Sequence, residues 1–133
     1  MNPLRVITED VPVIPSRGRV RTTTAGVCVF WRGADIYIKS GFTFDGASLP
    51  FFLWWWWCSP WTPWVVLAAC VHDYLYRFRY FTRRECDLMF RAILIHKARQ
   101  SRWRWLAYRR IIKARRMYRA VRQFGDNAVG ADW

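Results

Sequence analysis

The sequence predicts an α+β fold in a single domain, residues 1–133: a short N-terminal antiparallel β-meander followed by three α-helices, the first two paired as a hairpin. Two observations predict it. Apolar and polar residues alternate over residues 20–39, which is the period of a half-buried strand. Beyond residue 63, apolar residues recur every three or four positions, the period of an amphipathic helix. A chain of 133 residues, 53% of them hydrophobic, is large enough to form one modest hydrophobic core.

The N-terminal third of the chain is predicted to be extended. Residues 1–15 contain three prolines and alternating aliphatic residues, a pattern that indicates an extended arm with edge-strand character. Residues 16–45 are predicted to form the meander, with a turn at Arg32–Asp35. Its predicted strands are Val20–Thr24, Val27–Trp31 and Ile36–Lys39.

The middle of the chain is uncharged and aromatic. No formal charge occurs over residues 46–71, and four consecutive tryptophans occupy Trp54–Trp57. This length permits a transmembrane helix, but the run is interrupted by Pro50, Pro60 and Pro63. We therefore expect an aromatic loop or short helix over residues 46–62. The tryptophan rings either pack over a core or a subunit interface, or insert at the depth of lipid headgroups.

Residues 63–125 are predicted to be helical and residues 126–133 to form a tail. Helix starts are marked by residues able to cap a first turn: Thr62 followed by Pro63, Thr82 with Glu85 as a capping box, and Ser101. The predicted helices span about 63–77, 83–99 and 101–124, and Gly125 ends the last one.

The chain is strongly basic, with a formal net charge of +13. Residues 97–122 hold eleven basic residues and no acidic one. Such a segment is either a solvated helix face or a surface that binds phosphate groups, and without a sequence-reading motif its nucleic-acid binding would be nonspecific. Anionic membrane lipid and acidic protein partners are the alternatives.

The cysteines and the N-terminus indicate a reducing compartment. The four cysteines show neither CxxC spacing nor a zinc pattern, so we interpret them as mostly buried thiols; they are Cys28, Cys58, Cys70 and Cys86. Residues 1–15 lack a basic segment followed by a continuous apolar run, so no signal peptide is expected.

One predicted helix carries three groups able to do chemistry: His72, Asp73 and Tyr76. Positions i and i+4 share a helix face, so the imidazole of His72 and the phenol of Tyr76 can meet. His72 is the candidate general base. The carboxylate of Asp87, on the next helix, can keep the imidazole of His72 in one tautomer and orientation. Asp73 points elsewhere, and we expect it to hold a hard cation together with the loop at Asp45. The alternative is a buried histidine satisfied by a neighbouring carboxylate.

The two predicted helices of the hairpin carry the motif His72-Asp73-x-x-Tyr76, followed by Glu85-Cys86-Asp87. This pattern resembles the active-site helices of secreted phospholipase A2 enzymes. The resemblance implies a phospholipase-A2-like helix hairpin in which His72 activates water, while Asp87 and Tyr76 orient it. It also implies that Asp73 holds Ca²⁺ near the ester carbonyl.

A second set of motifs spans residues 41–90. It comprises Gly41-Phe-x-Phe-Asp-Gly-Ala-Ser-Leu-Pro50, Ser59-Pro60 after the tryptophans, His72-Asp-Tyr-Leu-Tyr76 and Asp87-x-x-Phe90. This set resembles a family of short uncharacterised proteins from tailed bacteriophages and bacteria. The resemblance implies a phage setting, in the virion or the host cytoplasm, more than it implies a reaction.

Three functions are compatible with these patterns. The first is a calcium-dependent phospholipid ester hydrolase acting peripherally at a host membrane, which requires an accessible His72. The second is a non-enzymatic virion or tail-assembly protein, in which the same residues form a structural network and His72 is enclosed. The third is a nonspecific nucleic-acid binder that uses residues 97–122. We expect the protein to be part of an assembly with virion or tail proteins, or to contact anionic lipid.

Overall fold

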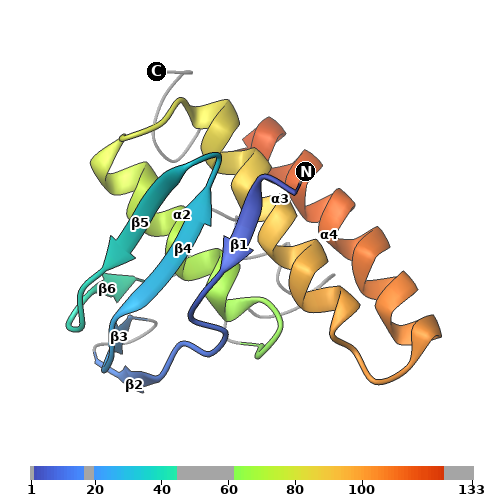
Figure 1. Cartoon of the computed structure of the whole chain (residues 1–133), viewed down its shortest axis with the longest axis horizontal. Helices are drawn as coiled ribbons and strands as arrows, with labels where there is room; N and C mark the ends of the chain where they lie inside the picture. Colours follow the sequence, from blue (N-terminus) through green and yellow to red (C-terminus); the bar gives the residue numbers. More distant parts are fainter. Residues whose placement is uncertain (1, 17–19, 45–61, 125–133) are drawn as a thin grey trace. The chain divides into compact units, whose positions relative to one another are not determined.

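The computed structural model describes residues 2–16, 20–44 and 62–124, and over these ranges it contains six short strands followed by three helices (Figure 1). The α+β prediction is therefore confirmed. The strands are β1 (Leu4–Val6), β2 (Val13–Pro15), β3 (Arg21–Thr23), β4 (Val27–Trp31), β5 (Ala34–Ile38) and β6 (Thr43–Phe44). The helices are α2 (Val66–Phe78), α3 (Arg83–Arg99) and α4 (Arg104–Phe124).

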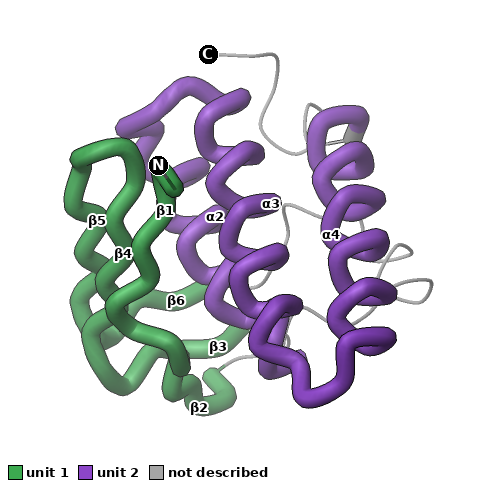
Figure 2. Tube along the Cα trace, turned by 45° about the vertical axis from the view of Figure 1, so that its right-hand side comes forward, with its two compact units in different colours: residues 1–45 green, residues 46–133 purple. Residues whose placement is uncertain are grey.

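The chain divides into two compact units, residues 1–45 and residues 46–133 (Figure 2). The first unit holds the strands and the second holds the helices. We describe each unit by itself, and the expectation of a single domain stays a prediction.

The strand unit contains two three-stranded antiparallel sheets, with strand orders β1-β4-β5 and β2-β3-β6. The hairpin of β4 and β5 is joined by Arg32 and Gly33, which both have positive φ, at 47° and 83°. Two residues of positive φ give the loop a twist that matches the flanking strands. Alternate residues of the hairpin are buried: Val27, Val29, Trp31, Ile36 and Ile38.

The structure differs from one continuous meander in the pairing of β3. This strand pairs with β2 and β6, whereas the edge of β4 is taken by β1, where Leu4 lies opposite Trp31. Buried Thr23 fixes the β3 pairing, because its hydroxyl accepts a hydrogen bond from the Phe42 amide at 3.1 Å and donates one to the Lys39 carbonyl at 3.4 Å. The arm of residues 1–15 thus supplies an edge strand to each sheet, as its pattern predicted.

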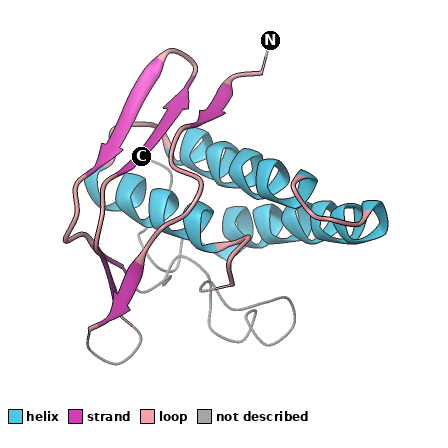
Figure 3. Ribbon diagram, turned by 60° about the horizontal axis from the view of Figure 1, so that its bottom comes forward, coloured by secondary structure: helices cyan, strands magenta, loops and turns pink. Residues whose placement is uncertain are grey.

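The helical unit is built around α3, which packs against both α2 and α4. Figure 3 shows the helices in cyan and the strands in magenta. On α2, ten of thirteen residues are buried, and the first six residues of the helix are all apolar. The contact faces of the other two helices are apolar as well; they bury Met89, Phe90, Ile93 and Leu94 on α3, and Ala114, Met117, Ala120 and Val121 on α4. Within the described residues, no helix has both the length and the apolar character needed to cross a membrane.

Two of the three predicted helix starts differ in detail from the structure. Thr82 caps α3 as predicted, since its hydroxyl accepts a hydrogen bond from the Glu85 amide at 3.3 Å. The first regular turn of α2 begins later than predicted, at Val66, after a turn in which the Thr62 carbonyl accepts bonds from two amides. Ser101 does not start α4 directly; its hydroxyl accepts a hydrogen bond from Arg110 at 2.9 Å.

Candidate histidine–aspartate site

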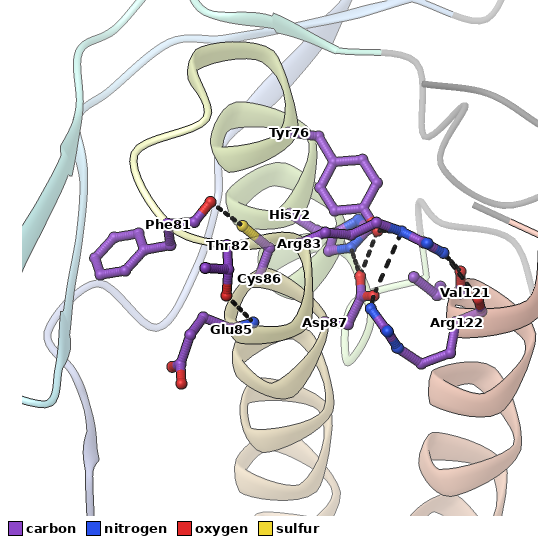
Figure 4. A network of polar contacts seen from close by, with 10 residues as sticks. All are labelled: His72, Tyr76, Phe81, Thr82, Arg83, Glu85, Cys86, Asp87, Val121 and Arg122. Carbon is purple, nitrogen blue, oxygen red and sulfur yellow. Dashed lines mark hydrogen bonds and ion pairs between the residues drawn. The ribbon is translucent and has the colours of Figure 1, made fainter. Parts of the chain in front are cut away.

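Three of the predicted site residues meet where α2 packs on α3. His72 and Tyr76 lie one turn apart on α2, with ring centroids 4.0 Å apart, and both point toward Asp87 on α3 (Figure 4). The His72 Nε2 atom lies 2.8 Å from Asp87 Oδ1, and the Tyr76 hydroxyl donates to the same oxygen at 2.5 Å. The structure thus brings these three side chains together, and their catalytic roles stay a prediction.

The hydrogen bond to Asp87 determines the tautomer of His72. An ionised carboxylate only accepts hydrogen bonds, so Nε2 must carry the proton that it donates. The other ring nitrogen, Nδ1, has no hydrogen-bond partner among the residues that the structure describes. A neutral imidazole in this orientation therefore presents an unprotonated Nδ1, which is the form of a general base.

Two arginines complete the network on the opposite side of Asp87. Arg122 on α4 donates from Nη1 to Asp87 Oδ2 at 2.9 Å. Arg83 donates from Nε to the Tyr76 hydroxyl at 3.3 Å, and from Nη2 to the backbone carbonyls of Val121 and Arg122 at 3.1 and 2.8 Å. The network thus joins α2, α3 and the last turn of α4.

The centre of this network is buried. His72 is 1% exposed, Asp87 0% and Arg83 2%, whereas the Arg122 side chain is 28% exposed. Burial of a carboxylate costs free energy unless hydrogen-bond donors replace the water that it loses. Three donors lie within 2.9 Å of the Asp87 oxygens and replace that water. The six-membered ring of Phe90, with its centroid 4.9 Å from that of His72, covers another side of the imidazole.

These donors decide the ionisation of Asp87. Burial alone would raise the pKa of its carboxyl, but the hydrogen bonds from His72, Tyr76 and Arg122 outweigh burial and lower that pKa. Burial and the hydrogen bond to Asp87 raise the pKa of the Tyr76 phenol, which keeps it a neutral donor.

A pH dependence follows from the lowered pKa of Asp87. The folded pKa lies below the ordinary value of 3.8, so the stabilisation is complete above about pH 5 and is lost as the pH falls through the folded value. We expect the free energy of unfolding of the wild type to decrease between about pH 5 and pH 2, and Asp87→Asn to flatten this decrease. Urea titrations at several pH values measure it, and equal slopes for both proteins would contradict the assignment.

Of the two predicted cation ligands, Asp73 and Asp45, the structure describes Asp73 alone. Asp73 lies on α2 and is 9% exposed, whereas Asp45 lies outside the described residues. Within the ranges that the structure describes, no group of three His, Cys, Asp or Glu side chains is placed to hold a metal ion. Calcium binding stays a prediction.

Two of the four cysteines are buried in the described structure. Cys70 and Cys86 are fully buried thiols, as predicted, and burial raises the pKa of both, that of Cys86 to about 12. Such thiols are unreactive near neutral pH. Cys28 is partly exposed, and Cys58 lies outside the described residues.

Arg83 and Arg122 were not predicted as members of the site. Arg83 carries a local signal, because it precedes Asp87 by four residues and these positions share a helix face. Arg122 is 35 residues from Asp87, and nothing local in the sequence connects the two.

Comparisons with known proteins identify a family and carry no information on the chemistry of the site. No curated protein and no solved structure matches the chain. A family model described as "Protein of unknown function (DUF1353)" matches residues 26–111, which include all of α2 and α3 and the first eight residues of α4. This range contains residues 41–90, in which the motifs of the phage and bacterial family lie. More than half of the chain is matched, and the protein belongs to the DUF1353 family, whose function is unknown.

Proposed function

We propose that the protein is a phage-associated carboxylic-ester hydrolase that acts on phospholipid, with His72 as its general base. The observation that carries the proposal is the 2.8 Å contact between His72 Nε2 and Asp87 Oδ1, with the Tyr76 hydroxyl on the same oxygen. This is the relation among the three side chains that the resemblance to secreted phospholipase A2 helices implies. The phage setting rests on the motifs of residues 41–90.

The chemistry assigned to the site is water activation. Nδ1 of His72 takes a proton from a water molecule, and the hydroxide attacks the ester carbonyl. The tetrahedral intermediate then breaks the ester C–O bond, and the imidazolium returns its proton to the leaving alkoxide, which gives a fatty acid and a lysophospholipid. Asp87 stabilises the imidazolium and holds the ring, and Tyr76 and Arg122 hold Asp87. Asp73 is the described residue proposed to contact Ca²⁺, and no step is derived through the ion.

Burial favours a second candidate function. His72 is 1% exposed, so hydrolysis requires a movement that admits the substrate, whereas a structural network requires none. The same residues connect three helices, which suits a non-enzymatic virion or tail-assembly protein. In that case the imidazole is a hydrogen-bond donor to Asp87 and nothing more.

Hydrolysis of mixed anionic phospholipid vesicles distinguishes the two candidates. We expect the wild type to release fatty acid in a calcium-dependent reaction, and His72→Asn to lower the rate at least about 100-fold, the lower range for loss of a general base. The asparagine amide is shorter than the imidazole and does not reach the position of Nε2, so the fold of this variant is checked independently. His96→Asn is the matched control, because His96 is a partly exposed histidine on α3 that contacts Gln100, and its loss is expected to leave the rate unchanged.

The outcomes separate cleanly when folding is checked by urea titration. Release by wild type and by His96→Asn, but not by a folded His72→Asn, supports the hydrolase. Absence of release from folded wild type, with and without calcium, overturns it and leaves the structural function. Equal release by His72→Asn and wild type would show that the fatty acid comes from a different site or a contaminant.

A further inference from the structure

The outer face of α4 is an exposed surface of unusual composition. We define it by the exposed residues of α4: Arg104, Trp105, Tyr108, Arg109, Arg115, Arg116, Arg119 and Gln123. At about 100° per residue these positions cover about 140° of the helix circumference. The buried residues of α4 lie on the other side of the helix, so the outer face is turned away from the core.

The outer face carries a concentrated positive charge. Its five arginines are accompanied by no Asp or Glu between residues 104 and 124. None of the five forms an ion pair with any residue in the described part of the chain. The arginines span about 22 Å along the helix axis, from Arg104 to Arg119, which matches about six nucleotides of stacked strand. The planar guanidinium also suits bidentate contact with phosphate oxygens.

Exposed aromatic rings lie among these arginines. Trp105 is 59% exposed and Tyr108 is 68% exposed, and on the helix circumference they fall between Arg104 and Arg109. A helix that inserts into a membrane surface presents a continuous apolar face, but the apolar face of α4 is packed against α3. Rings interleaved with cations are instead the composition of surfaces that hold phosphates while bases stack on the rings.

We propose that the outer face of α4 binds single-stranded nucleic acid without sequence preference, through phosphate contacts of its arginines and base stacking on Trp105 and Tyr108. The proposal is independent of the hydrolase, because none of the outer-face residues belongs to the network of Asp87. Arg122, which contacts Asp87, is not part of the outer face.

Binding of a fluorescent 20-nucleotide single-stranded DNA, followed by anisotropy, tests the proposal. We expect log Kobs to fall with log salt concentration at a slope of about −3.5, since five phosphate contacts contribute about 0.7 each. The variant Arg109→Gln, Arg115→Gln, Arg119→Gln is expected to weaken binding at least about tenfold and to reduce the slope by about 2. Its control removes the same charge from exposed positions elsewhere: Arg5→Gln, Lys39→Gln, Arg84→Gln.

Further variants separate the contribution of base stacking from that of charge, and vesicles test a membrane as the alternative partner. Trp105→Ala with Tyr108→Ala is expected to weaken binding about tenfold without changing the salt slope, because stacking releases no counterions. His72→Asn is expected to bind like wild type. Equal weakening by the two triple variants overturns the proposal, as does unchanged affinity after loss of both rings. Binding to vesicles of anionic phospholipid with no binding to the oligonucleotide overturns it in favour of a membrane surface.

Discussion

Replacing Asp87 with alanine is expected to lower the free energy of unfolding by about 3–5 kcal/mol, the range for removal of one partner from a buried ion pair. The substitution leaves His72 Nε2, the Tyr76 hydroxyl and the Arg122 guanidinium without the acceptor that all three share. Two of these donors are buried, at 1% and 4% exposure, and water cannot replace the carboxylate without opening the contact of α2 with α3. Urea unfolding followed by tryptophan fluorescence measures the loss.

Two further variants make this result specific. Asp35→Ala removes an exposed aspartate from β5 and is expected to change stability by less than about 0.5 kcal/mol. Asp87→Asn keeps one acceptor oxygen but turns an amide N–H₂ toward a donor, so an intermediate loss is expected. A loss below about 1 kcal/mol for Asp87→Ala would show that the network contributes little to stability.

The sequence predicts the helical unit better than the strand unit, and the physical reason is the range of the contacts involved. Helix periodicity and the Thr82 cap are local, and α3 has the bounds that they predict. Part of the strand pairing depends on distant segments: β1 joins β4 across twenty residues or more, and β3 pairs with β6 rather than with β4, which follows it directly in sequence. Alternation identifies a strand, but it does not identify the strand's partner.

The same distinction applies to the site. His72 and Tyr76 share a helix face, and a short connection returns the chain to place Asp87 opposite them, so this part of the geometry could be predicted. Arg122 comes from another helix, and its contact depends on how α4 packs on α3. In the sequence Arg122 is one arginine in a basic run and has nothing to distinguish it from Arg119 or Arg116, which are exposed.

Arg83 also provides hydrogen bonds to the C-terminal turn of α4. The last carbonyls of a helix have no partner within the helix, and here Arg83 Nη2 donates to those of Val121 and Arg122. Its Nε donates to Tyr76, which in turn donates to Asp87. A single guanidinium therefore connects the hydrogen bonds of the site to the C-terminal turn of α4.

We expect Arg83→Met to lower the free energy of unfolding by about 3 kcal/mol, because two carbonyls and a phenol lose a charged donor while the methionine retains much of the buried volume. Arg83→Lys keeps the charge but cannot reach all three acceptors at once, so an intermediate loss is expected. Arg84→Met is the matched control, since Arg84 is the next residue of the same helix and is exposed. Urea unfolding measures the losses, and hydrogen exchange of the last amides of α4 locates them. Equal stability of Arg83→Met and Arg84→Met would mean that solvent replaces Arg83, and then the end of α4 would be held by packing of Met117 and Val121 alone.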